Sequence, residues 1–169
     1  MIRYKKMERK SVALRIGPAG VEVRLPLGVS ARSAEIKRVV ATQLSKAARL
    51  APTDPEPTRA LAKAELMREV DEWTVRLGVA PRRTQVRRMS SRWGSCTSLG
   101  NVTLSERILR MPLSLRDYLI CHEITHLHEL SHGSGFQRLM SAAMPDWRKR
   151  EKELCGWVAR QELAVLSRR

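Results

Sequence analysis

Two histidines and a glutamate near residue 122 have the spacing of a metal-binding catalytic motif. His122 and His126 lie four residues apart, and Glu123 follows the first of them directly. Side chains four residues apart on a helix project from one face, so both imidazoles can reach one Zn²⁺ at about 2.1 Å. Glu123, one step round the helix, can hold a metal-bound water and take its proton. The motif predicts a zinc-dependent hydrolase with Glu123 as the general base.

The residues around this H-E-x-x-H motif favour metal binding over a structural pair of histidines. All four histidines of the chain lie between His122 and His132. Ser114 with Asp117, just after Pro112, predicts the N-cap of a helix that carries the motif. The pattern predicts that this helix is largely buried, and buried imidazoles need partners. The apolar positions of this predicted helix are Leu119, Ile120, Ile124, Leu127 and Leu130.

A third protein ligand is expected, with the fourth position left to water. His132 is the first candidate, because Ser131 and Gly133 can end the helix and let the chain turn back. Ser134 then predicts a capping box that opens the next helix. The competing candidates are Glu151 and Glu153, carboxylates on the last predicted helix. His128, two residues from His126, points elsewhere and is not expected to be a ligand.

The motif and its flanking residues together resemble the bacterial YgjP-like metallopeptidase-domain family, which is similar in its core to the SprT and Wss1-type proteases. The resemblance covers roughly residues 84–155 and implies a zincin-like, zinc-dependent peptidase. A longer strand-rich insert, expected between the N-terminal hairpin and the helices, is not present here. The residues that carry the resemblance are Arg92-Trp93-Gly94-Ser95-Cys96, Gly100-Asn101, Tyr118, His122-Glu123, His126-Leu127, His132, Phe136 and Pro145-Asp146-Trp147.

The hydrophobic pattern predicts an α+β fold, in which a small antiparallel sheet packs on the active-site helix. A short N-terminal β-hairpin at 11–26, with a turn at Gly17-Pro18-Ala19-Gly20, precedes a helix over 31–50. The domain boundaries predicted from these patterns are a basic hairpin–helix region over 1–50, a proline-containing linker over 51–57 and a zincin-like metallohydrolase domain over 58–169. The other predicted elements are helices over 61–77, 136–143 and 147–165, and strands over 84–89 and 101–104.

The cleft expected beside the metal has three further candidate residues. Zincins pair an extended peptide with a strand beside the active-site helix, and Asn101–Ser105 or its neighbour is the expected edge. Arg92 and Ser95 precede that strand and are candidates for binding a substrate carbonyl or the transition state. Tyr118, one turn before His122, is a candidate hydrogen-bond donor, with packing as the alternative role.

Positive charge is the second strong signal in the sequence. The chain has 32 Lys and Arg against 17 Asp and Glu, a net charge of +15. Such a field favours polyanions, and Arg83, Arg87 and Arg88 are the candidate DNA or RNA contacts. Charge that serves solubility alone is the alternative. Two further functions stay open: a metal-dependent nucleotide pyrophosphatase, also suggested within the family, and a nucleic-acid-binding protein with a structural metal.

The remaining features concern location and assembly. No run of 18 apolar residues is present, so no membrane span is expected, and the basic start lacks the apolar stretch of a secretory signal. Cys96, Cys121 and Cys155 show no C-x-x-C spacing, which is typical of reduced thiols in a cytoplasm. The sequence therefore predicts a cytoplasmic protein that acts on a protein or peptide, and no feature of it predicts the oligomeric state.

Overall fold

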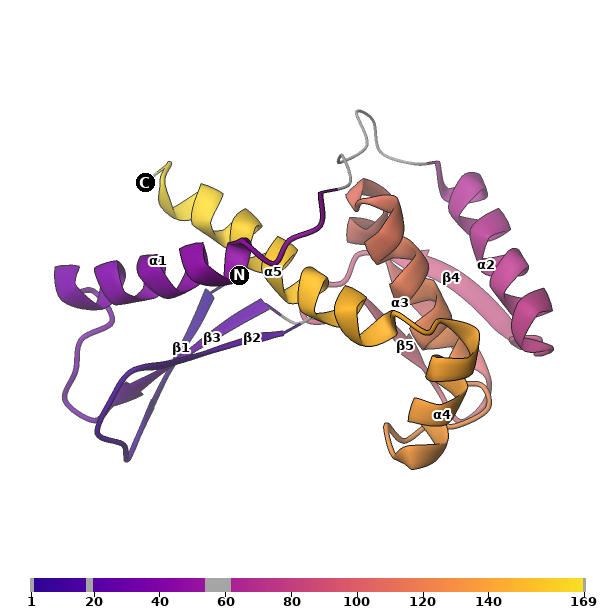
Figure 1. Ribbon diagram of the computed structural model, residues 1–169, viewed down its shortest axis with the longest axis horizontal. Coiled ribbons are helices and arrows are strands. Elements are labelled where there is room, and N and C mark those ends of the chain that lie inside the picture. Colours follow the sequence, from indigo (N-terminus) through magenta and orange to yellow (C-terminus); the bar gives the residue numbers. More distant parts are fainter. Residues whose placement is uncertain (1, 18–19, 54–61, 169) are drawn as a thin grey trace. The chain divides into compact units, whose positions relative to one another are not determined.

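The computed structural model describes residues 2–17, 20–53 and 62–168 (Figure 1). The chain forms two compact units. The first unit comprises Met1–Pro52 and Lys152–Arg169, and the second unit is Thr53–Glu151. Each unit contains helices and one three-stranded sheet, which confirms the predicted α+β class.

The sheet of the first unit contains the predicted hairpin and one strand that was not predicted. The hairpin strands β2 (Ala13–Gly17) and β3 (Gly20–Pro26) pair antiparallel, and Pro18 and Ala19 of the predicted turn lie outside the described residues. Strand β1 (Ile2–Met7) pairs parallel to β3, so β3 is the central strand. Because β3 is central, Val21, Val23 and Leu25 are fully buried.

Two helical segments complete the core of the first unit. Helix α1 (Ala34–Ala48) begins where the Ser33 hydroxyl accepts a hydrogen bond from the Ile36 backbone N–H at 3.2 Å. Helix α5 (Trp147–Leu166) starts in the second unit and continues into the first. At Gly156 a Cβ would lie 2.3 Å from the backbone nitrogen of Ala51, so only glycine allows this close approach.

The second unit has a mixed sheet, whereas an antiparallel one was predicted. Strand β6 (Asn101–Ser105) is central in the order β4-β6-β5. Strand β4 (Arg83–Arg87) runs parallel to it, and β5 (Gly94–Cys96) runs antiparallel. The expectation that Asn101–Ser105 is itself an edge was therefore wrong, and its neighbour β5 is the edge that contacts the active-site helix.

Three helices and a 3-10 turn surround this sheet. Helix α2 (Lys63–Leu77) ends at Gly78, whose φ of 63° is the left-handed conformation that favours glycine. Residue 61 of this predicted helix lies outside the described residues. A 3-10 turn (Glu106–Arg110) leads to α3 (Leu113–Thr125), and α4 (Ser134–Ala143) follows. Buried Arg116 of α3 binds Glu69 of α2 through two hydrogen bonds of 2.6 and 2.7 Å, which fixes α3 against α2.

The structure corrects three local predictions for these helices. The N-cap of α3 is Pro112 and not Ser114, and α4 starts without the capping hydrogen bond expected from Ser134. Helix α3 ends at Thr125, so Leu130 is not on a buried helical face, and half of its surface is exposed. The predicted linker over 51–57 includes residues 54–57, which lie outside the described part of the chain.

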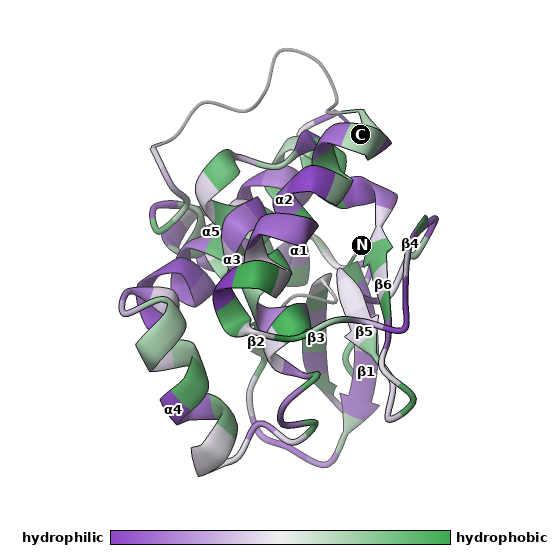
Figure 2. Cartoon of the chain, turned by 90° about the vertical axis from the view of Figure 1, so that its right-hand side faces the viewer, coloured by the Kyte–Doolittle hydropathy of each residue, from purple (hydrophilic) through white to green (hydrophobic). Residues whose placement is uncertain are grey.

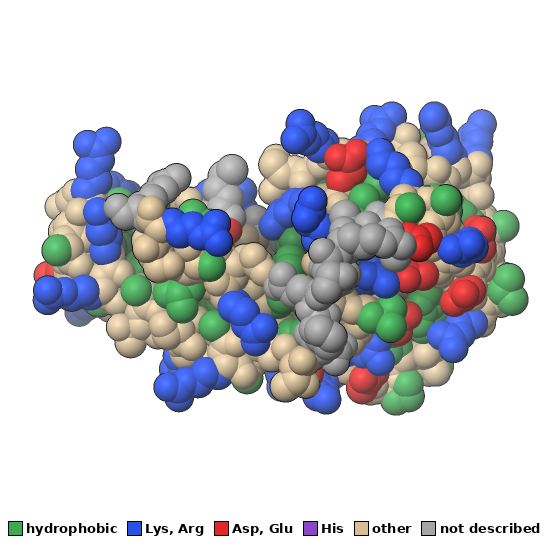
Figure 3. All heavy atoms as spheres, turned by 90° about the horizontal axis from the view of Figure 1, so that it is seen from above, with side chains coloured by type: hydrophobic (Ala, Val, Ile, Leu, Met, Phe, Trp, Pro, Cys, Tyr) green, Lys and Arg blue, Asp and Glu red, His purple; other side chains and the backbone are tan. Residues whose placement is uncertain are grey.

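Hydrophilic residues are frequent in the helices, and basic side chains are frequent on the surface. Figure 2 shows hydrophilic and hydrophobic residues alternating along the helices, and no helix in the described ranges has the length and apolar character to cross a membrane. On the face drawn in Figure 3, Lys and Arg side chains are spread widely, while Asp and Glu side chains gather on one part of it. This agrees with a net charge of +15.

Candidate metal site

The side chains of His122, His126 and His132 meet at one point in the second unit. The Nε2 atoms lie 3.3 Å apart between His122 and His126, 3.1 Å between His126 and His132, and 3.0 Å between His132 and His122. Three tetrahedral ligands at about 2.1 Å from one ion would stand about 3.4 Å apart. The donor set and its spacing therefore fit a divalent metal, and they form the one group of potential ligands found among the described residues.

Local structure orients these rings. Helix α3 places His122 and His126 on one face, and it ends at Thr125, where the chain turns away. The Nδ1–H of His126 donates to the backbone oxygen of Glu129 at 2.9 Å, which leaves the lone pair of its Nε2 directed into the cluster. The segment between α3 and α4 then returns His132 to the same point, as its position in the sequence predicted.

Phe136 of α4 supports all three imidazoles from one side. Its ring centroid lies 4.9 Å from His122, 4.6 Å from His126 and 4.8 Å from His132, and it stacks on His126 at 27°. Phe136 is 1% exposed and is the single phenylalanine of the chain. From the sequence, Phe136 was placed on a helix and among the residues that carry the family resemblance, but its contact with the three imidazoles was not predicted.

Burial favours the neutral form of two of the three imidazoles, those of His122 and His126. Burial, followed by the neighbouring His126 and His132, lowers the pKa of His122 to about 3. The pKa of His126 is also lowered, chiefly by burial. Neutral imidazole is the form that coordinates a metal, so protons compete weakly for these nitrogens at neutral pH.

Glu123 lies beside the cluster, against the edge strand β5. It is 7% exposed, and burial raises its pKa to about 8, an effect that the positive charge of Arg92 partly offsets. A Cβ on Gly94 of β5 would lie 2.5 Å from both Cγ and Cδ of Glu123. Gly94 therefore leaves the space that this carboxylate occupies. From the sequence, Gly94 was noted as part of the segment that carries the family resemblance, and its contact with Glu123 was not predicted.

The structure gives each of the other three cleft candidates a different environment. Arg92 is exposed and close enough to Glu123 to act on its charge. Next to Arg92, Trp93 is buried under the guanidinium of Arg107, 3.8 Å from the ring centroid, which anchors the turn before β5. Ser95 is half-buried on β5, and the ring of Tyr118 stands edge-on to His122 at 5.8 Å.

Comparison with protein families agrees with this geometry. The model of the YgjP-like metallopeptidase domain matches residues 55–155, a range that includes the three histidines and Glu123. The chain belongs to the YgjP-like metallopeptidase family. It is therefore a metal-dependent peptidase by family, and a protein or peptide is the substrate that this family implies. No curated protein matches the chain.

Two solved structures resemble this YgjP-like chain. The first is the metallopeptidase zymogen of Pyrococcus abyssi abylysin, with 22% identity, a TM-score of 0.46, and coverage of 52% of this chain and 88% of that one. The second is the metallopeptidase zymogen of Methanocaldococcus jannaschii jannalysin, with 18% identity, a TM-score of 0.43, and coverage of 61% and 95%.

Several residues considered from the sequence lie outside the histidine cluster of the YgjP-like domain. Neither Glu151 nor Glu153 is a member of it. His128 is exposed, and its Nε2–H donates to the backbone oxygen of Leu77 at 2.9 Å. The candidate nucleic-acid contacts are likewise apart from the cluster and exposed at or beside the edge strand β4; they are Arg83, Arg87 and Arg88.

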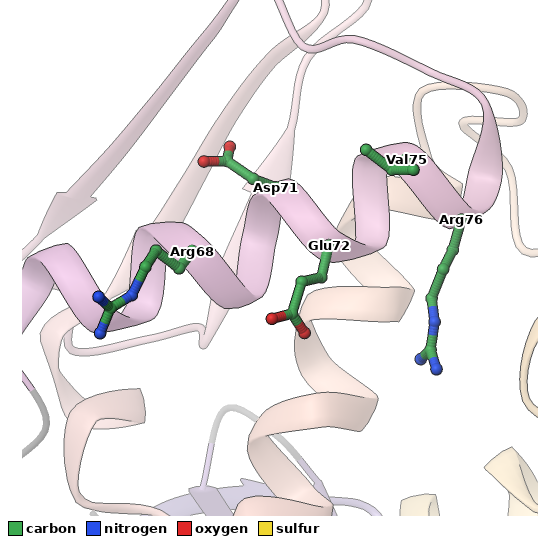
Figure 4. A pocket seen from close by; sticks show the side chains of 5 residues that line it. All are labelled: Arg68, Asp71, Glu72, Val75 and Arg76. Atoms are coloured by element: carbon green, nitrogen blue, oxygen red, sulfur yellow. The ribbon is translucent and has the colours of Figure 1, made fainter.

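Two surface pockets also lie outside the cluster. One, of about 650 Å³, is lined by α2 side chains alone, which project from successive turns of the helix in Figure 4. The other, of about 480 Å³, includes Trp73 of α2 and Leu139 of α4, and it borders His128. Neither of these two pockets is lined by the three clustered histidines or by Glu123.

Proposed function

We propose that this chain is a zinc-dependent peptidase in which His122, His126 and His132 hold the metal and Glu123 is the general base. The observation that carries the proposal is the approach of three imidazole nitrogens to within 3.0–3.3 Å of one another, next to the buried carboxylate of Glu123. When bound, zinc supplies Lewis acidity for the scissile carbonyl and lowers the pKa of water toward about 7.

The side chains of the protein would manage the proton and the substrate. Glu123 accepts the proton of the attacking water and delivers it to the leaving amine. The Arg92 guanidinium, exposed and near Glu123, would stabilise negative charge on the carbonyl oxygen, with Ser95 and Tyr118 as neighbouring polar groups.

The unpaired edge of β5 would align the substrate. This strand pairs with β6 on one side only, so its other edge offers backbone N–H and C=O groups to an extended peptide. Because Gly94 of β5 packs on Glu123, a peptide on this edge passes close to the general base. The proposed substrate is therefore an extended segment of a protein or peptide.

A nucleotide pyrophosphatase remains the second candidate, favoured by the exposed positive charge of Arg92 at the site. Peptides and nucleoside triphosphates should be assayed side by side with the same enzyme preparation. Cleavage of peptides alone supports the peptidase, and cleavage of the triphosphate alone would replace it with the phosphoanhydride reaction.

The metal assignment is tested by single changes of each histidine. His122→Ala, His126→Ala and His132→Ala should each lose stoichiometric zinc in elemental analysis of purified protein, because two ligands hold the ion far more weakly than three. His128→Ala is the matched control, since this histidine lies in the same segment but outside the cluster, and it should keep its zinc. Full zinc content in His132→Ala would remove His132 from the ligand set.

A further inference from the structure

The first unit carries most of the net positive charge of the chain. Its 70 residues hold 16 Lys and Arg against five Asp and Glu, a net charge of +11 out of +15. The family match starts at residue 55 and ends at 155, so most of this unit lies outside the metallopeptidase domain. Peptide hydrolysis gives no reason for this charge.

The sheet of the first unit has an apolar face and a cationic face. Figure 1 shows α1 and the C-terminal part of α5 on one side of its strands, and the buried side chains of β3 belong to that side. The intervening residues point to the other face, where no helix of the described part of this unit lies. Strand register aligns them in three rows across the sheet: Arg3, Glu22 and Arg15 in the first, Lys5, Arg24 and Ala13 in the second, and Met7 with Pro26 in the third.

The cationic face is only partly neutralised. Its one carboxylate, Glu22, accepts a hydrogen bond from Arg24 at 2.6 Å, and this bond is the main cause of the lowered pKa of Glu22. Arg3, Lys5 and Arg15 are exposed and have no hydrogen-bonded carboxylate among the described residues. Lys5 is the register partner of Arg24, so two cations are neighbours on this face. Four cations therefore share one carboxylate, which leaves a net positive charge that a bound anion would neutralise.

We propose that this cationic sheet face binds the phosphate backbone of duplex DNA. Residues two apart on a strand are about 6.6 Å apart, and neighbouring strands about 4.8 Å, so the cations form a flat array that can contact several phosphates. The face has no aromatic side chain for stacking single-stranded bases. Its apolar side chains, Met7, Ala13 and Pro26, are all partly buried and offer little apolar surface to a lipid bilayer. Phosphate contacts of this kind hold DNA without reading its sequence.

The test measures binding of a fluorescein-labelled 20-base-pair DNA duplex by anisotropy between 50 and 200 mM salt, with the full chain. The sheet variant combines Arg3→Gln, Lys5→Gln and Arg15→Gln. We expect it to weaken binding at least tenfold at the lowest salt. We also expect the slope of log affinity against log salt to flatten by about 0.9 for each phosphate that the variant no longer neutralises.

Two control variants each remove three positive charges from other parts of the surface. One combines Lys37→Gln, Arg38→Gln and Lys46→Gln, which are exposed on α1 of the same unit. The other combines Arg83→Gln, Arg87→Gln and Arg88→Gln, the contacts predicted from the sequence. Both should bind DNA within about threefold of the unchanged protein. An equal loss in the α1 variant, or a larger loss in the Arg83 variant, would overturn the assignment to the sheet.

A single charge reversal distinguishes a loss of DNA binding from a loss of folding. Lys5→Glu places a carboxylate opposite Arg24, which favours the sheet, yet it should weaken DNA binding. A melting temperature that is unchanged or raised, together with weaker binding, supports the proposal. Three results would overturn the proposal. The Lys5→Glu variant could bind DNA as tightly as the unchanged protein, or the unchanged protein could fail to bind DNA at 50 mM salt. The third is that the unchanged protein binds phosphatidylserine vesicles and not DNA. Zinc content and peptidase activity should not change in any of these sheet variants, because the histidine cluster lies in the other unit.

Discussion

At the scale of single residues, a change at Glu123 distinguishes metal binding from catalysis. Glu123→Gln preserves the size of the side chain but removes its ability to take a proton. We expect zinc content to stay stoichiometric while kcat falls by roughly 10²-fold or more. Elemental analysis and peptide cleavage on the same preparation measure both quantities. Activity close to that of the unchanged enzyme would assign the general base to another group.

The same variant should make the metal-free protein more stable at high pH. Burial raises the pKa of Glu123 from 4.5 to about 8, so the folded chain binds this proton more tightly than the unfolded chain does. The resulting stability is fully present below pH 4.5 and is lost as the pH rises to about 8. After zinc is removed by a chelator, Glu123→Gln should therefore have a higher free energy of unfolding than the unchanged protein at pH 8, by on the order of a few kcal/mol. At pH 4.5 the two proteins should be equally stable. Denaturant titrations at the two pH values measure both quantities.

At the scale of elements, the contact between β5 and α3 positions the general base. Gly94→Ala would bring a Cβ within 2.5 Å of the Glu123 side chain, which is free to rotate away, whereas the backbone need not move. We expect the fold and the zinc content to survive while kcat falls about 10²-fold and KM changes little, because about 1 Å of displacement is enough to misplace a catalytic group. Steady-state kinetics measure kcat and KM, and a melting curve checks that the fold is intact.

Gly17→Ala is the matched control for that change. Gly17 lies at the end of a strand in the first unit, and a Cβ there meets nothing within 4 Å. Its kinetics should equal those of the unchanged enzyme. If Gly94→Ala shows the same normal kinetics, the close approach at Gly94 has no catalytic importance.

The elements also explain what the sequence pattern was able to predict. The four-residue spacing of His122 and His126 is a local property of a helix, so their meeting was predictable, and the return of His132 followed from the breakers after the motif. The end of α3 at Thr125 was not predicted, because the apolar pattern continues past it. There the His126 Nδ1–H bond to the Glu129 oxygen accompanies a turn out of the helix, which apolar spacing does not encode.

Strand pairing was the harder part to predict. Half of the residues of Ile2–Met7 are charged and the segment gave no strand signal, yet β1 pairs along its whole length with β3. The central place of β6 likewise depends on β4, which is 14 residues or more away in the sequence and parallel to it. Such pairings are decided by long-range backbone hydrogen bonds and not by the local alternation of side chains. Gly94 and Phe136 were undervalued for the same reason, since their partners lie on other elements.

At the scale of the whole molecule, the metal should stabilise one unit selectively. All three clustered histidines belong to the second unit, and the first unit has a core of its own. A ligand that binds only the folded state stabilises the structure that forms its site. Chelation should therefore reduce the hydrogen-exchange protection of α3 and α4, measured by mass spectrometry, while β1, β2 and β3 keep theirs. Equal loss of protection in both units would mean that they unfold as one.

The discontinuity of the first unit has a consequence for the order in which the chain is completed during synthesis. Leu154, Trp157 and Val158 of α5 belong to its buried core, and Gly156 packs against the backbone at Ala51. These residues leave the ribosome only after the entire second unit has been made. Domains generally fold as their residues emerge, so the second unit has all its parts first. The nascent β1, β2, β3 and α1 would meanwhile expose apolar side chains until α5 arrives, which makes this interval the one in which a chaperone is most needed.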